Sequence, residues 1–389
     1  MAEDVEMLNM PEDVLIDILS WLPVKSLVRF RCVCKAWFDL IRNPVFVVKH
    51  HLKQTTLNNI TLLVRHGEGD NIFSLISSLA KDEDDAEQMI AVTETINIPF
   101  TNSFSEYAQV LGPCNGLICL SDPNSSKIAI WNPSSREFKP LPLSPIKRAK
   151  HSAFGSCGFG FDRKTNDYKV LRIVTQYLNQ RRCWVNQAEI YSLDADSWRE
   201  IPTLEHLPQD IGDIPCFNTY HDGHYYWRAF RGRGGLILSF DFADEVFEVL
   251  PLPDPGEGIS WNNYSWHLAI FNGCIAAVLY AWQDPEKCFD LWVMTERGVK
   301  DSWVKQARIG PISGVDRPLE FWRNGGLFLK NSRGQLVLYD PSTQQLKNLQ
   351  LPGPQGRLQV VTYVESLVPI NGRREDEDDL FVRTTIQNS

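Results

Sequence analysis

The feature that most constrains the fold is a unit of about 50 residues that recurs between residue 115 and the end of the chain. An Asn-Gly or Asp-Gly pair opens a unit, and in three units a second apolar run ends on Asn-Pro, Asp or Asp-Pro before a Leu-Pro closes it. Asx-Gly pairs favour turns with positive φ, and Asx side chains bond the backbone two residues on, so both markers indicate turns between short strands. The openers are Asn115-Gly116, Asp222-Gly223, Asn272-Gly273 and Asn324-Gly325.

This period, with about four short strands a unit, is typical of β-propeller blades of the kelch length. The stretch from Cys157 to Pro202 lacks the opening pair but shows the same strands and a closing Ile-Pro. Because each blade buries its faces only against its neighbours, we expect a closed ring of about six blades over residues 58–370. The segment Leu358 to Val368 alternates as a strand, and we expect it to close the ring by pairing with Ile60 to Arg65.

Composition favours a folded protein and excludes several classes. Hydrophobic residues make up 43% of the chain, which suffices for a large core, and no apolar run approaches the length of a membrane span. The acidic start, MAEDVEMLNM, lacks the basic and apolar regions of a secretory signal, so we expect a cytoplasmic or nuclear protein. The nine cysteines have no framework or zinc spacing, so we expect reduced thiols, no metal and no cofactor.

Residues 11–42 differ from the rest of the chain because their apolar residues recur at helical spacing. Pro11 is a suitable first helical residue, Glu12 and Asp13 complement the helix dipole, and Pro23 ends the first helix. About 40 residues in short helices cannot bury enough surface to be comfortably stable alone. We therefore expect a partner or the β domain to cover part of the apolar surface, which leaves two readings open, a docking module and a helical cap.

The order L-P-x-K-S-L-x-R-F-R-C-V-C-K-x-W from Leu22 to Trp37 closely resembles the F-box of plant F-box proteins. The later stretches GPCNGLICL, IWNPSSREFKPLP, GFGFDRKTNDYKVLRI and LSFDFADEVFEVLPLP resemble the F-box-associated interaction domain of the same proteins, including those of the S-locus self-incompatibility group. The resemblance divides the chain into an all-α F-box at 1–53, an all-β kelch-like propeller at 58–370 and an acidic, flexible tail at 371–389.

The resemblance implies a substrate-recognition subunit of a Skp-cullin-F-box (SCF) ubiquitin ligase. The F-box would bind a Skp-type adaptor and through it the cullin, while the propeller would hold a target protein for ubiquitination and proteasomal degradation, in the self-incompatibility group a style ribonuclease. The basic Lys25, Arg29 and Lys35 suit an acidic adaptor, whereas Trp21 departs from the family pattern and could pack against the first blade instead. The residues carried over to the adaptor face and its supporting core are Pro11, Val14, Ile18, Leu22, Pro23, Lys25, Leu27, Arg29, Val33, Cys34, Lys35 and Trp37.

No catalytic motif stands out, so we expect a non-catalytic receptor. The chain has no P-loop and no G-x-S-x-G, and Gly158 to Phe161 is a strand rather than a dinucleotide loop, because no helix pattern follows it. A glycan or small-ligand receptor is the alternative, and a propeller enzyme would need carboxylates or histidines clustered on the ring axis. Trp and Arg in the irregular stretches are the expected substrate anchors, namely Arg181, Arg182, Trp184, Arg231, Arg233, Trp261 and Trp266.

Charge is unevenly distributed along the chain. The first 53 residues contain seven Lys and Arg and seven Asp and Glu, so the formal net charge of −9 belongs to the remainder. Such a charge disfavours nucleic acid and anionic membranes, and it favours encounter with a basic protein through steering that salt weakens. We therefore predict a basic protein substrate, and no nucleic-acid or membrane partner.

Overall fold

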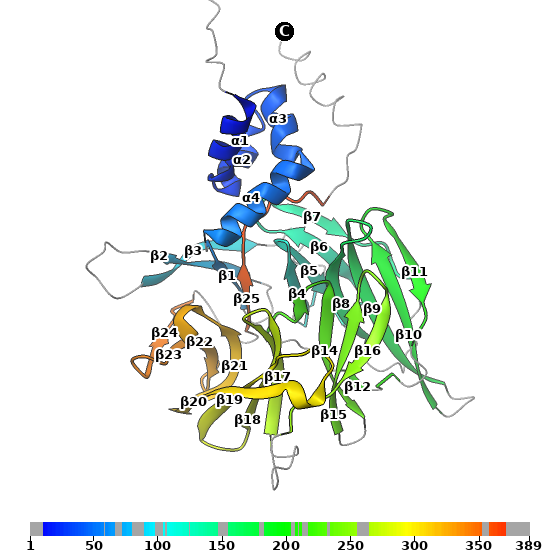
Figure 1. Ribbon diagram of the computed structural model, residues 1–389, viewed down its shortest axis with the longest axis vertical. Coiled ribbons are helices and arrows are strands. Elements are labelled where there is room, and N and C mark those ends of the chain that lie inside the picture. Colours follow the sequence, from blue (N-terminus) through cyan, green and yellow to red (C-terminus); the bar gives the residue numbers. More distant parts are fainter. Residues whose placement is uncertain are drawn as a thin grey trace, which may run out of the picture.

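In the computed structural model of the protein, six antiparallel β-sheets form a ring, and four helices lie beyond the ends of β1 and β25 (Figure 1). The prediction of an N-terminal helical unit followed by a propeller of about six blades is confirmed. None of the helices that the structure describes is long and apolar enough to cross a membrane. The described residues are 11–57, 59–66, 72–79, 89–97, 104–105, 107–123, 125–146, 155–178, 183–203, 207–208, 210–211, 217–231, 234–254, 264–351 and 358–370.

The helical unit comprises α1 (Glu12–Ser20), α2 (Val24–Phe30), α3 (Lys35–Arg42) and α4 (Pro44–Thr56). Pro11 and Pro23 stand at the N-caps of the first two helices, and the Asn43 side chain caps α4, because its Oδ1 accepts from Val45 N at 2.8 Å. The unit thus continues to Thr56, beyond the expected end at residue 53. Its buried apolar core consists of Leu19, Val24, Leu27, Ile41, Phe46 and Val47, joined by Leu367 from the far end of the chain.

The six blades follow one another along the chain, apart from the first, which takes its innermost strand from the C-terminal part. The first blade contains β25 (Gln359–Tyr363), β1 (Thr61–His66), β2 (Ile72–Leu79) and β3 (Met89–Asn97), and the second contains β4 (Gln109–Cys114), β5 (Leu117–Ser121), β6 (Ile128–Asn132) and β7 (Glu137–Pro140). The third contains β8 (Gly155–Asp162), β9 (Asp167–Leu178), β10 (Cys183–Ser192) and β11 (Ser197–Ile201).

The fourth blade contains β12 (Asp210–Ile211), β13 (Tyr220–His221), β14 (His224–Arg231), β15 (Gly234–Asp241) and β16 (Val246–Leu250). Both β12 and β13 pair with β14, so two short pieces share the position of one strand. The fifth contains β17 (Tyr264–Phe271), β18 (Cys274–Ala281), β19 (Glu286–Met294) and β20 (Trp303–Ser313), and the sixth β21 (Val315–Phe321), β22 (Leu327–Asn331), β23 (Leu336–Asp340) and β24 (Gln345–Asn348).

The Asx-Gly openers form tight turns between the first and second strands of a blade. In Asn115-Gly116 φ is 48° and 78°, the left-handed values of a type I′ hairpin turn, and Asp222-Gly223 and Asn272-Gly273 have the same form. The fourth opener differs from this expectation, because Asn324-Gly325 belongs to the short 3-10 helix η4 (Arg323–Gly325), and φ is 77° at Gly325.

The second marker of each unit starts the turn between the third and fourth strands. Asn132 Oδ1 accepts from Ser134 N at 3.0 Å, and Asp241 Oδ1 accepts from Ala243 N at 2.7 Å. These bonds are the reason for an Asx residue at this position, since its side chain satisfies backbone donors that the turn leaves unpaired.

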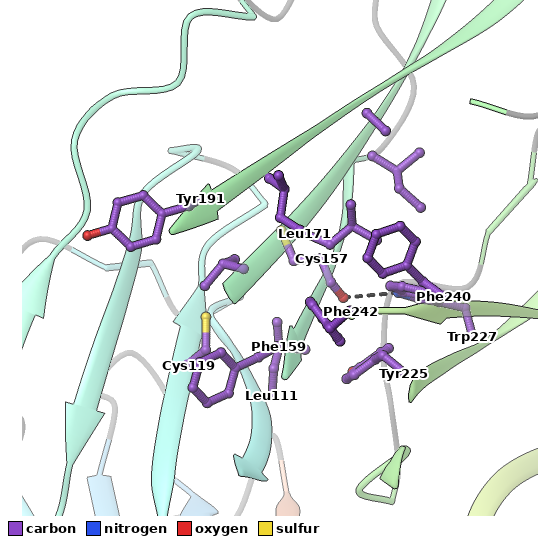
Figure 2. Packing of buried hydrophobic residues seen from close by; sticks show 14 of the residues in the cluster. Leu111, Cys119, Cys157, Phe159, Leu171, Tyr191, Tyr225, Trp227, Phe240 and Phe242 are labelled. Carbon is purple, nitrogen blue, oxygen red and sulfur yellow. Dashed lines mark hydrogen bonds between the residues drawn. The ribbon is translucent and has the colours of Figure 1, made fainter. Parts of the chain in front are cut away.

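The largest hydrophobic core lies between the second, third and fourth blades (Figure 2). Phe159, Tyr225 and Phe240 are among its buried aromatic side chains, and the indole nitrogen of Trp227 donates to the carbonyl of Cys157 at 3.0 Å. Blades therefore bury one another's faces, as the propeller prediction requires.

The ring closes where β1 pairs antiparallel with β25, from Thr61 opposite Tyr363 to Arg65 opposite Gln359. This confirms the predicted closure, although the strand ends at Tyr363 and not at Val368. The residues that follow leave the sheet because they run towards the helices, where Leu367 is buried.

The helices lie on a defined face of the ring, because the chain enters through β1 and leaves through β25, which are neighbouring strands. In the other blades a turn joins the strands at these two positions, so the helical unit takes the place of that turn. The chain after β25 contacts two turns of this face, since Asn132 Nδ2 donates to Ser366 O at 3.0 Å and a Cβ added at Gly116 would lie 2.3 Å from Ser366 Cβ. The strand ends joined by the turns between second and third strands, and by the connections between blades, therefore lie on the opposite face, which we call the free face.

Removing residues 358–389 deletes β25, so we expect the whole ring to lose its cooperative β structure, because β1 then lacks its paired strand and the inner strands β4 and β21 lose the strand that lies between them. Far-UV circular dichroism and a thermal melt measure this loss. Removing residues 371–389 is the matched control, since it keeps β25 and should keep the transition. A soluble protein that still melts cooperatively after the longer truncation would contradict the closure.

Candidate functional site

The predicted adaptor face is an exposed surface of the helical unit with apolar and basic side chains. Val14 and Ile18 on α1 are 46% and 47% exposed, and Val33, between α2 and α3, is 61% exposed. Exposed apolar side chains on α1 and on the α2–α3 connection are surface that another protein can cover. Leu22 and Trp37 are partly buried, while Pro11, Pro23, Lys25, Arg29, Cys34 and Lys35 are exposed.

Leu27 plays a different part from the other residues of the predicted set. Its side chain is 0% exposed and packs in the helical core with Val24, Ile41 and Phe46. Leu27 therefore supports the adaptor face from inside, and a substitution there would test the folding of the F-box rather than the contact.

Trp21, at the end of α1, packs against α4. The Lys53 ammonium lies 3.7 Å from the centroid of the Trp21 ring, a cation–π distance, while the indole stays half-exposed. The indole of Trp21 thus lies beside α4, which extends far enough to reach it.

An apolar stripe on α4 was missed by the sequence analysis. Val45, Val48 and Leu52 are exposed at positions i, i+3 and i+7 of one helix face. Their helical spacing is present in the sequence, but they lie beyond residues 11–42, where the sequence analysis recognised the helical pattern.

His50 holds the turn that contains Leu22 and Pro23. The ring is fully buried, and its Nε2 lies 2.9 Å from Leu22 O, so the neutral ring donates to that carbonyl. Nδ1 is buried without a hydrogen-bond partner among the described residues. Burial therefore lowers the pKa of His50 below its ordinary value.

The structure describes the side chains of two of the seven predicted substrate anchors, of which one is buried and the other exposed. Trp266 is 3% exposed in the core between the fourth and fifth blades, beside Phe230, so it is a core residue and not an anchor. Arg231 is exposed at the end of β14, next to the turn into β15 on the free face. Trp184 is the second residue of β10, but its side chain lies outside the described part of the structure, as do Arg181, Arg182, Arg233 and Trp261.

Trp282 is an exposed aromatic residue that the sequence analysis missed. It lies in the connection between β18 and β19, on the free face, and is 54% exposed. The buried Lys287 stabilises this connection, because its Nζ donates to the carbonyls of Trp282 at 2.7 Å and Asp284 at 2.5 Å. A large aromatic side chain on a rigid, exposed loop has the properties of an interface anchor.

Two hollows on the same face accompany these loops. A pocket of about 460 Å³ beside the Trp282 loop has a polar lining that includes Asp284, Asp316, Lys330 and Ser332. A second of about 300 Å³ is mainly apolar, between the second and third blades. Its lining includes Phe104, Leu141, Leu143, Pro142 and Trp198. The free face thus offers both polar and apolar contact sites.

The inner strands carry isolated buried titratable groups. Glu320 in β21 accepts from Phe321 N at 2.9 Å, and burial raises its pKa to about 8. His267 in β17 lies 3.1 Å from the Tyr280 hydroxyl, and burial with help from Arg228 lowers its pKa to about 3. Both groups are therefore neutral near pH 7. In the described part of the chain, no three His, Cys, Asp or Glu residues lie close enough to hold a metal ion.

An exposed helical surface joined to a propeller is the arrangement of a binding protein with two domains. Comparison with known proteins agrees with it. Residues 7–49 match the F-box domain and residues 67–370 match the F-box associated beta propeller domain. The chain is 30% identical over 351 residues to the F-box/kelch-repeat protein At3g23880 of Arabidopsis thaliana, over 86% of this chain and 88% of that protein. It is 28% identical to the F-box protein At3g07870 of the same plant, over 89% of this chain and 88% of that protein.

A third Arabidopsis relative, the F-box protein CPR1, is 25% identical over 93% of this chain and 89% of its own length. The matches span both the helices and the ring. The chain belongs to the family of plant F-box proteins that carry an F-box-associated β-propeller domain.

Acid should destabilise the F-box through His50. Its folded-state pKa lies below the ordinary value of about 6.5, so below that pH the unfolded chain binds a proton that the folded chain does not. The free energy of unfolding should therefore fall between pH 7.5 and 5.5, by at most about 1.4 kcal/mol per pH unit for this group. Denaturant titrations at the two pH values should show a smaller fall for His50→Gln, while an equal fall in both proteins would contradict the role of His50.

Proposed function

We propose that this protein is the substrate-recognition subunit of an SCF-type ubiquitin ligase, acting without catalysis of its own. The observation that carries the proposal is the separation of two binding surfaces on one molecule. The exposed apolar side chains of α1 and of the α2–α3 connection suit a Skp-type adaptor that leads to the cullin, while the free face, with the exposed Trp282, lies on the side of the ring opposite the helices.

This arrangement explains how a protein without an active site can promote ubiquitination. A receptor that holds its target and the ligase at once raises the effective concentration of the target near the conjugating enzyme. Because the F-box replaces a turn on one face of the ring, the adaptor does not compete with a target that binds the opposite face. The ubiquitinated target is then degraded by the proteasome.

The substrate that fits best is a basic protein. Residues 58–370 contain 29 Lys and Arg and 36 Asp and Glu, a net charge of −7, so the propeller attracts cations and repels nucleic acid and anionic membranes. A style ribonuclease in self-incompatibility is the specific candidate, supported by the resemblance of the propeller sequence to the S-locus group. The expected place of action is the cytoplasm, with the nucleus as a second site.

A glycan or small-ligand receptor is the alternative function, and one observation favours it. The exposed indole of Trp282 stands beside a polar pocket whose carboxylate and hydroxyl groups could bond sugar hydroxyls. A Trp282-dependent shift of indole fluorescence on adding a purified glycan would favour this reading. A shift that appears with a basic protein stripped of its glycans would favour protein recognition.

Adaptor binding should depend on the exposed residues of α1. Val14→Asp and Ile18→Asp each place a carboxylate in an apolar contact, so we expect at least about tenfold weaker binding to a purified Skp-type adaptor at an unchanged melting temperature. Val246→Asp is the matched control, because Val246 is as exposed but lies on the outer strand β16. Wild-type affinity in both α1 variants would contradict the assigned face.

Substrate binding should depend on Trp282 and on salt. Trp282→Ala should weaken capture of the substrate from native tissue with the proteasome blocked, whereas Val304→Ala, exposed on the outer strand β20, should not. With the captured substrate, the association rate should fall on raising salt from about 0.05 to 0.5 M, because screening weakens the attraction. A rate that stays flat over this range would exclude steering by the acidic propeller.

A further inference from the structure

Residues 364–370, which follow β25 and which we call the connecting segment, are built into the F-box. Leu367 is buried in the helical core with Leu19, Val24 and the other core residues. Two residues earlier in the chain, Glu365 Oε2 accepts from Val24 N at 3.1 Å, at the start of α2, and Glu365 O lies 3.4 Å from His51 Nδ1. The segment thus supplies both an apolar core residue and a helix cap.

The same segment is bonded to the second blade on its other side. Asn132 Nδ2 donates to Ser366 O at 3.0 Å and to Val368 O at 2.9 Å, and Ile370 N donates to Glu137 Oε2 at 2.8 Å. Ile370 belongs to the large core of the ring. In Figure 1 this stretch runs below α4 towards β7. The F-box and the ring therefore share one strip of backbone, with buried side chains in each.

The position of Leu367 depends on the closure of the ring. Tyr363 is the last residue of β25 that pairs with β1, opposite Thr61, and Leu367 follows it by four positions. A chain of four residues reaches at most about 14 Å. If β25 left β1, the segment would lose its N-terminal anchor, and only its contacts with the second blade, through Asn132, Glu137 and Ile370, would still hold Leu367 near the helical core.

The F-box has little core with which to compensate for that loss. Six of its own apolar residues are buried together with Leu367. A helical unit of this size is only marginally stable without added contacts, so the removal of one buried leucine shifts its folding equilibrium strongly.

We propose that the connecting segment couples adaptor binding to the closure of the propeller. The F-box presents its adaptor face only while β25 is paired with β1, and a bound adaptor in turn stabilises that pairing, since coupling between two sites is reciprocal. A receptor whose substrate domain is open or incomplete is then not loaded onto the ligase. The coupling rests on the proposed role of the F-box in adaptor binding.

The first test compares the same substitution at two leucines of the full-length protein, with a purified plant Skp-type adaptor as the probe. Leu367→Ala should weaken adaptor binding at least about tenfold, because it removes a core contact of the F-box. Leu346→Ala should leave binding unchanged, because Leu346 is 41% exposed on the outer strand β24 of the sixth blade. Equal, wild-type affinity of the two variants would overturn the coupling.

A second readout separates this inference from the proposed function. Without adaptor, amide hydrogens of α2 and α3 should exchange faster in Leu367→Ala than in Leu346→Ala, because the helices open more often. If the wild-type protein fails to bind the adaptor, the proposed function fails, and this exchange result still supports or overturns the dependence of the F-box on Leu367.

The reciprocal effect supplies the third readout. Saturating adaptor should slow amide exchange in β1 and β25 at least about fivefold, and should leave β18 in the distant fifth blade unchanged. Adaptor that binds the wild-type protein but leaves β1 and β25 unaffected would overturn the coupling.

Discussion

The pairing of β1 with β25 is the interaction on which the rest of the structure depends. Backbone hydrogen bonds connect residues 61–65 with residues 359–363, which come from opposite ends of the propeller sequence. Within the first blade this pairing covers the edge of β1 and makes β25 the innermost strand of the sheet. It also determines where the helices can stand, because the chain enters and leaves the ring at adjacent strands on one face.

That placement assigns separate roles to the two faces of the ring. The face with the hairpin turns receives the helices and the connecting segment, while the free face keeps the loops, the exposed Trp282 and the two pockets. Between them, the inner strands hold Glu320 and His267 in neutral form, since burial disfavours the charge of each. Under the proposed function, the adaptor and the substrate bind on opposite faces of the ring.

Part of the candidate site could be read from the sequence, and part could not. Val14, Ile18 and Val33 were correctly predicted to lie on the helical unit and are exposed, whereas Leu27 has the same helical pattern but is fully buried. Helical periodicity identifies the apolar side of a helix, but it does not show whether the same chain or a partner protein covers that side. For the same reason Trp266 was taken for an anchor and proved to be core, while Trp282, inside an apolar run, was passed over.

The sequence by itself determined the blade period, the type I′ turns at Asn115-Gly116 and its equivalents, and the helices between their prolines, because turn chemistry and helical periodicity act over a few residues. The closing strand was also predictable, because Leu358 to Val368 alternates as a strand and Ile60 to Arg65 offers a second strand with which it can pair. The tertiary structure alone decided that Leu367 completes the F-box, that Trp21 packs under Lys53, and which face of the ring stays free. Each of these depends on contacts between residues distant in the chain, which no local pattern records.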